Sequence, residues 1–126
     1  ARARTTLEVC PTSNLQTNPA LGDLARHPLR RMLRHELAVA LCTDNRLVSH
    51  TSLTEEYLKV IEALDLDRKT LRRLVTAGFK GAFFPGDYTS KRAYVRQALR
   101  LFDQVIPEAP DDPAAARPGR QSPPQP

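Results

Sequence analysis

The sequence predicts an α/β fold in which two short parallel strands share one sheet and helices follow them. Two apolar runs indicate the strands, at residues 7–10 and 37–42, and each ends abruptly at polar residues. A helical pattern lies between the runs, and the order strand, helix, strand within one sheet gives parallel strands. Apolar residues at helical spacing then continue to about residue 106.

The segment between the strands is expected to contain a loop and a short helix. Residues 11–23 are rich in Pro, Thr, Ser, Asn and Gly, which is typical of a loop. Pro28 suits the first turn of a helix, where its missing N–H is no loss, and the helix should end near Glu36. The run at 37–42 is apolar at every position, as in a strand buried on both faces of a parallel sheet.

Three helices are predicted after the second strand. Ser52 and Glu55 have the spacing of a capping box, and Asp67 suits the cap of the next helix. Asp87 or Thr89 is expected to open the last helix. Apolar stripes with the helical period indicate faces that pack on a core. In the first and last helices these stripes are Leu53, Tyr57, Val60, Ile61 and Leu64, and Val95, Leu99, Phe102 and Ile106.

The composition changes at Pro107. From 107 to 126 the sequence is dominated by Pro, Ala, Asp, Gly, Arg, Ser and Gln, and large apolar residues are absent. Such a segment cannot bury enough apolar surface to fold. We therefore expect one domain at 1–106 and a disordered, Pro-rich tail at 107–126.

The bulk properties indicate neither a nucleic-acid nor a membrane partner. The net charge is +5, but the basic residues are scattered, mixed with acidic ones and not interleaved with aromatic residues, so we expect no nucleic-acid partner. No apolar run could span a bilayer and no signal peptide opens the sequence, so we expect no membrane partner. Cys10 and Cys42 lack metal-binding spacing and are predicted to be free thiols of a cytoplasmic protein. The oligomeric state stays open.

Polar residues follow both predicted strands, at 11–14 and at 43–45. The carboxyl ends of parallel strands meet at one edge of the sheet, where ligands bind in α/β folds. Asp44, shortly after a fully apolar strand, suits a metal ligand or a proton acceptor. The alternative is an Asp that only caps the following loop.

Several blocks, in order, resemble motifs of the adenosine deaminase family. They read L-E-V-C-P-T-S-N at 7–14, H-P-L at 27–29, L-C-T-D-N-R-L-V-S at 41–49 and G-F-K-G-A-F-F at 78–84. The resemblance implies the C-terminal portion of a (β/α)₈ TIM-type barrel, namely its last two strands and its C-terminal helices. It also implies zinc-dependent hydrolytic deamination of adenosine to inosine, with a purine nucleoside as the small-molecule partner.

The resemblance assigns roles to two adjacent residues. The Asp of the T-D-[DN] motif, here Asp44, would be a catalytic residue that ligates Zn²⁺ and hydrogen-bonds the attacking water. The next residue in the family, usually Asp, contacts the purine ring, and here it is Asn45. An Asn amide can donate directly to a ring nitrogen, so Asn45 is expected to bind substrate.

The other catalytic groups that the resemblance implies are absent from this sequence. The family uses an H-x-H pair, two further histidines and a Glu in an H-A-G-E-like segment, whereas this chain has only His27, His35 and His50. His27 matches the family's H-P turn, and the other two are expected to be solvated. A catalytic zinc needs about three protein ligands, so we expect the 126 residues alone to be inactive.

Two other functions are compatible with the residues. One is a related aminohydrolase that acts on another purine, such as adenine. The other is a small basic helical binding module with no metal and no catalytic role. A binding module has no need for an apolar strand that ends in Thr43-Asp44-Asn45, so this feature favours an enzyme.

Overall fold

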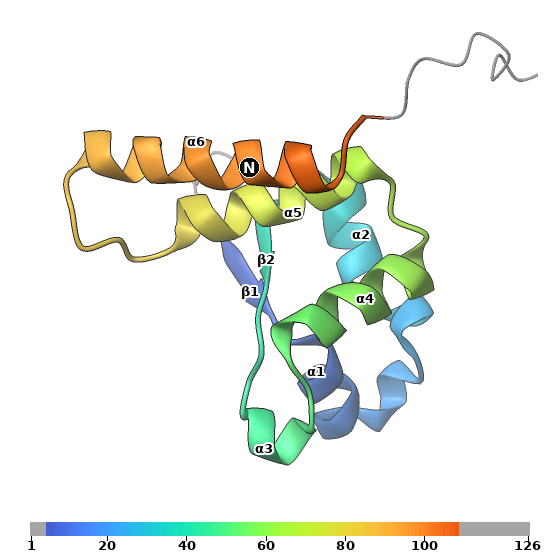
Figure 1. Cartoon of the computed structure of the whole chain (residues 1–126). Coiled ribbons are helices and arrows are strands. Elements are labelled where there is room, and N and C mark those ends of the chain that lie inside the picture. The colour runs from blue at the N-terminus through green and yellow to red at the C-terminus, as the bar shows by residue number, and fades with distance from the viewer. Residues whose placement is uncertain (1–4, 109–126) are drawn as a thin grey trace, which may run out of the picture.

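A computed structural model describes residues 5–108 of the chain (Figure 1). The expected tail lies outside the described residues except for Pro107 and Glu108, which are exposed and belong to no helix or strand. The described part is a mixed structure with a small sheet and mostly helices.

Two strands form the sheet, β1 (Leu7–Val9) and β2 (Val39–Leu41). They are parallel, with Leu7 opposite Val39 and Val9 opposite Leu41. The Cys42 amide extends the ladder because it donates to the carbonyl oxygen of Val9 at 2.9 Å. The prediction of two parallel strands is confirmed, and every residue of β2 is buried, as its apolar sequence indicates.

The prediction of a loop throughout residues 11–23 is wrong. Helix α1 (Pro11–Thr17) begins directly after β1, and a 3₁₀ turn, η1 (Pro19–Leu21), follows it. Pro11 is the first residue of α1, where its fixed φ favours the helix and its missing N–H costs nothing. Polar residues that favour turns on local grounds are here held in a helix by contacts with distant segments.

The short helix before β2 is confirmed as α2 (Leu29–Arg34), and a second 3₁₀ turn, η2 (Leu24–Arg26), precedes it. Leu29 and Leu33 of α2 are buried. After β2 come α3 (Arg46–Ser49) and the three predicted helices, α4 (Leu53–Leu64), α5 (Arg68–Gly81) and α6 (Tyr88–Val105).

The predicted helix caps are confirmed. Ser52 and Glu55 form a complete capping box at the start of α4. The side chain of Asp67 accepts from the Thr70 amide at the start of α5. Of the two candidates for the last helix, Asp87 is the cap. Each cap satisfies a backbone donor that the helix itself leaves unpaired.

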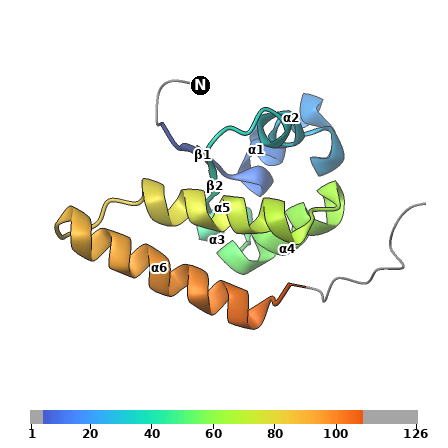
Figure 2. The same cartoon turned by 90° about the horizontal axis from the view of Figure 1, so that it is seen from above.

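The helices are arranged in layers around the sheet. Helix α5 lies between the strands and α6, as the two views show (Figures 1 and 2). Gly81 allows α5 to approach the chain before β1, because a Cβ at this position would lie 2.8 Å from the Thr6 hydroxyl oxygen. The core joins residues of both strands to three helices: Val9, Leu29, Leu33, Val39, Leu41, Val60, Leu64 and Leu74.

Both strands run toward α1 and α3. In Figure 1 these two helices lie together at the lower end of the molecule, and they contact each other. The polar residues predicted to share one edge of the sheet therefore do so, at the end opposite to α6.

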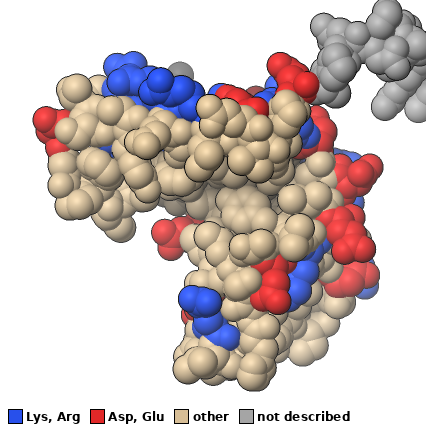
Figure 3. Space-filling view, viewed as in Figure 1, with Lys and Arg blue, Asp and Glu red and all other residues tan. Residues whose placement is uncertain are grey.

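No helix within residues 5–108 is both long enough and apolar enough to cross a membrane. The charged surface is mixed. Figure 3 shows acidic and basic side chains near one another at the right of the molecule and a large uncharged area at its centre.

Candidate functional site at the strand ends

Asp44 follows β2 and is paired with a residue that follows β1. The Ser13 hydroxyl of α1 donates a hydrogen bond of 2.9 Å to Asp44 Oδ2. Ser13 is buried, whereas Asp44 is exposed. The pairing uses Oδ2 and leaves the lone pairs of Oδ1 available to a ligand. The carboxylate is therefore oriented by the protein and accessible from outside.

Asn45, the predicted substrate-binding residue, caps α3. Its Oδ1 accepts from the amides of Leu47 and Val48 at 3.1 and 3.2 Å. The residue that caps α3 is thus Asn45 and not Asp44. Since the oxygen is used by the helix, the side-chain NH₂ is the group that Asn45 can offer to a ligand, and it can only donate.

His27 is buried and has a structural role. Its Nδ1 accepts from the Leu29 amide at 3.0 Å, so the proton lies on Nε2, which donates to Asn14 Oδ1 at 3.2 Å. Burial lowers the pKa of His27, which favours this neutral form. His27 thus joins α1 to the start of α2, in agreement with the predicted turn. His35 and His50 are exposed, as predicted.

The two cysteines lie at the strand ends as half-buried free thiols. Cys10 directly follows β1 and Cys42 directly follows β2. Burial raises the pKa of both thiols, and nearby acidic groups, including Asp44 for Cys10, raise it further. A raised pKa favours the protonated thiol near neutral pH, and the thiol is a poorer nucleophile than the thiolate.

Among the described residues, Asp44 could serve as one of the several ligands that a zinc ion needs. Asp44 supplies one oriented carboxylate, an oxygen donor that zinc accepts. Within residues 5–108, however, no group of three or more His, Cys, Asp or Glu side chains is arranged to hold a metal. A complete zinc site would need ligands from outside this part of the chain.

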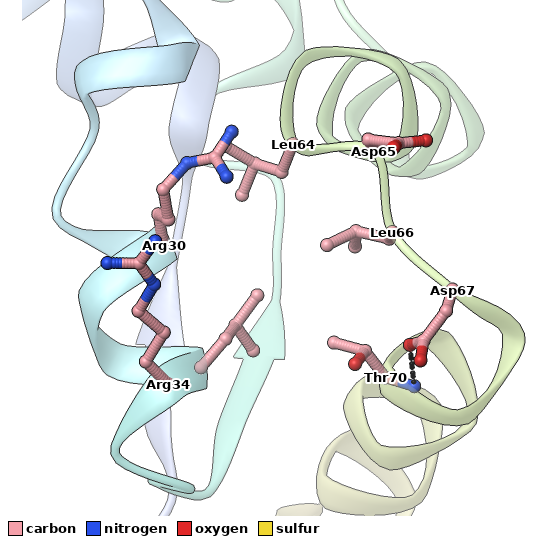
Figure 4. A pocket seen from close by; sticks show the side chains of 8 residues that line it. Arg30, Arg34, Leu64, Asp65, Leu66, Asp67 and Thr70 are labelled. Atoms are coloured by element: carbon pink, nitrogen blue, oxygen red, sulfur yellow. Dashed lines mark hydrogen bonds between the residues drawn. The ribbon is translucent and has the colours of Figure 1, made fainter. Parts of the chain in front are cut away.

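A separate cavity of about 320 Å³ lies between α2 and the link from α4 to α5 (Figure 4). Arg30 and Arg34 line one side, and Asp65 and Asp67 line the other. Asp67 is already used by the Thr70 amide at 2.8 Å. The charges of both signs favour no ligand of one sign, and none of the strand-end residues lines this cavity.

A polar helix follows β1 and an oriented carboxylate follows β2, and together they make the carboxyl edge of the sheet the candidate site of this α/β structure. The family model described as adenosine deaminase matches residues 1–97. This chain belongs to the adenosine deaminase family.

Curated relatives agree with the family model. Adenosine deaminases from Mycobacterium tuberculosis (strain ATCC 25618 / H37Rv) and Mycobacterium sp. (strain KMS) are each 37% identical over 103 residues. The match covers 82% of this chain and 26% of each relative. The adenosine deaminase of Mycolicibacterium vanbaalenii is 36% identical over the same length. The chain spans about a quarter of the length of these relatives.

Proposed function

We propose that this chain forms part of a zinc-dependent adenosine deaminase that hydrolyses adenosine to inosine. The observation that carries the proposal is the Asp44 carboxylate, held by Ser13 at the carboxyl edge of the sheet in a member of this family. The match covers about a quarter of each relative, so we propose that the remaining ligands and the proton-transferring Glu lie outside this sequence.

The proposed role of Asp44 is to ligate zinc and to accept a hydrogen bond from the attacking water. Zinc, when bound, lowers the pKa of a water molecule and so supplies a nucleophile near neutral pH. The protein's contribution is orientation: Ser13 fixes one oxygen of the carboxylate, and this fixes the direction of the other.

Asn45 is proposed to orient the purine. Its oxygen caps α3, which leaves the amide NH₂ to donate to a ring nitrogen. A neutral Asn donates at any pH, whereas an Asp in its place would have to be protonated to do so. This donor matches the acceptor nitrogens that adenosine and adenine share. Asn45 therefore supports a purine substrate but does not distinguish adenosine from adenine.

The proposed fold of the whole enzyme is a (β/α)₈ barrel in which β1 and β2 are neighbouring strands. Their parallel pairing and the helices between and after them are the repeating unit of such a barrel. Active sites of these barrels lie at the carboxyl ends of the strands, where Asp44 lies. We also propose a cytoplasmic location, because both cysteines are free thiols.

A chimaeric enzyme tests the proposal. Residues 1–106 would replace the matching segment of the Mycobacterium tuberculosis relative, and the chimaera would be assayed with adenosine and with adenine. We expect the chimaera to convert adenosine to inosine. Asp44→Ala should abolish turnover and zinc binding. The control Glu62→Gln alters an exposed carboxylate on α4 and should change neither. Normal activity with full zinc occupancy in Asp44→Ala would refute the assignment.

The same assay separates the alternatives. Faster turnover of adenine than of adenosine would show a related aminohydrolase. A folded chimaera that neither binds zinc nor acts on either purine would favour a binding module with no metal and no catalytic role. Membership in the deaminase family favours the enzyme over the module.

A further inference from the structure

Glu56 is a buried carboxylate on α4 that the proposed reaction does not use. Its side chain is among the most buried of the described residues, with 1% exposure. Its neighbour Glu55, by contrast, is exposed in the capping box. A buried carboxylate is costly unless donors surround it, so the contacts of Glu56 indicate its purpose.

The two oxygens of Glu56 join the segments that follow the two strands. Oε2 accepts from the backbone amide of Thr12, in the first turn of α1, at 3.0 Å. Oε1 accepts from the hydroxyl of Thr51, in the link between α3 and α4, at 2.8 Å. Each oxygen thus accepts from a different segment, and Glu56 links the start of α1 to the segment before α4.

The Thr12 contact places the serine that orients Asp44. Ser13 is the next residue in α1, and its hydroxyl donates to Asp44 Oδ2. Lys59, one turn along α4 from Glu56, donates to the Thr12 hydroxyl at 3.2 Å and fixes the same turn of α1. A continuous path of contacts therefore leads from α4 through α1 to Asp44.

We propose that Glu56 is a positioning residue that fixes the orientation of the Asp44 carboxylate through Thr12 and Ser13. The functional value of this orientation rests on the proposed deaminase reaction, but the structural coupling itself does not. An apolar residue at 56 would match the buried face of α4 but would leave the Thr12 amide without its acceptor. The Thr51 hydroxyl would keep only its longer contact of 3.4 Å with the Ser52 carbonyl oxygen.

The test is an NMR measurement on the chimaeric enzyme, freed of zinc, at constant neutral pH. The readouts are the exchange rate of the Thr12 amide and the ¹³C chemical shift of the Asp44 carboxyl group. Ser13→Ala gives the reference shift of an Asp44 that has lost its partner. Glu56→Leu removes the acceptor, Glu56→Gln conserves it, and Glu62→Gln is the matched control on the exposed face of the same helix.

In Glu56→Leu we expect Thr12 exchange to accelerate about tenfold or more, the equivalent of one lost hydrogen bond. The Asp44 resonance should move toward its position in Ser13→Ala. Glu56→Gln should stay near the wild type, because its amide can accept from Thr12 and donate to the Thr51 hydroxyl. The control should leave both readouts unchanged.

An unmoved Asp44 resonance in a folded Glu56→Leu chain would overturn the proposal, since a purely structural Glu56 would lower stability alone. If Glu56→Leu fails to fold, Thr51→Val decides, because it removes one anchor of Glu56 at nearly constant volume. We then expect a smaller shift of Asp44 in the same direction, and no shift would overturn the proposal. Neither readout depends on deaminase activity, so failure here is distinguishable from failure of the proposed function.

Discussion

The Ser13 hydroxyl lies 2.9 Å from Asp44 Oδ2, although 31 positions separate the two residues in the chain. The contact joins helix α1, which follows β1, to the segment that follows β2. Parallel pairing of the strands brings these segments together, and the hydrogen bond then selects one orientation of the carboxylate. The fold thus supplies the position of Asp44, and Ser13 supplies its direction.

Ser13→Ala in the chimaeric enzyme should lower activity without unfolding the protein. The variant keeps the helix and removes only the donor to Asp44, and loss of a hydrogen bond to a metal ligand typically costs about 10- to 100-fold in metal affinity or activity. The measurement is kcat/KM for adenosine together with zinc content. Ser90→Ala, an exposed serine on α6, is the control and should behave as the wild type. Full activity in Ser13→Ala would show that the hydrogen bond from Ser13 to Asp44 is not required for catalysis.

Two substitutions at Asn45 should separate its cap from its proposed substrate contact. Asn45→Ser keeps an oxygen that can cap α3 but removes the amide donor, whereas Asn45→Ala removes both. Loss of a substrate hydrogen bond costs roughly 1–3 kcal/mol, so both variants should lose about one to two powers of ten in kcat/KM. Thermal denaturation should show a lower Tm for Asn45→Ala only. If Asn45→Ser is fully active, the amide does not contact the purine.

The 126-residue chain by itself should not deaminate adenosine. Its sequence contains no H-x-H pair, and the residues that the structure describes bring together no metal-binding cluster. Without a bound metal, the nucleophile that the reaction needs is not formed near neutral pH. The assay follows the absorbance change as inosine forms, with the purified chain and added zinc. Turnover above a blank that contains zinc alone would contradict this expectation.

Local patterns were sufficient to predict most elements of this fold. Ser52, Asp67 and Asp87 cap the helices that their spacing predicts, because capping depends on residues within one turn. The apolar run at 37–42 predicted β2 for a similar reason, since a strand buried on both faces must be apolar throughout.

Contacts between distant segments explain what the sequence did not predict. Residues 11–17 have turn-forming side chains, yet they form α1, whose first turn donates to Glu56, 44 positions away. Glu56 carried one local signal: it lies three residues after Leu53 and four before Val60, on the face of α4 that should be apolar. That signal marks a buried carboxylate but does not name Thr12 and Thr51 as its partners.

Asp103 should make the stability of the chain depend on pH in the acid range. Its carboxylate accepts hydrogen bonds of 2.6 Å from Arg68 and of 2.9 Å from Arg72, which tie α6 to α5. The hydrogen bond from Arg72 is the main cause that lowers the pKa of Asp103, to about 2 from the model-peptide value of 3.8. A carboxyl group whose pKa is lower in the folded state than in the unfolded state favours folding when ionised.

The stabilisation by Asp103 is therefore complete above about pH 4 and is lost as the pH falls through the folded-state pKa near 2. Asp103→Asn should lower the midpoint of urea denaturation at neutral pH and make the midpoint depend less steeply on pH between about 4 and 2. Glu62→Gln, which alters an exposed carboxylate on α4, is the control. The guanidinium groups of Arg68 and Arg72 stay charged throughout this pH range. If the urea midpoint of Asp103→Asn depends on pH as steeply as that of the wild type, the ion pairs of Asp103 do not form in solution.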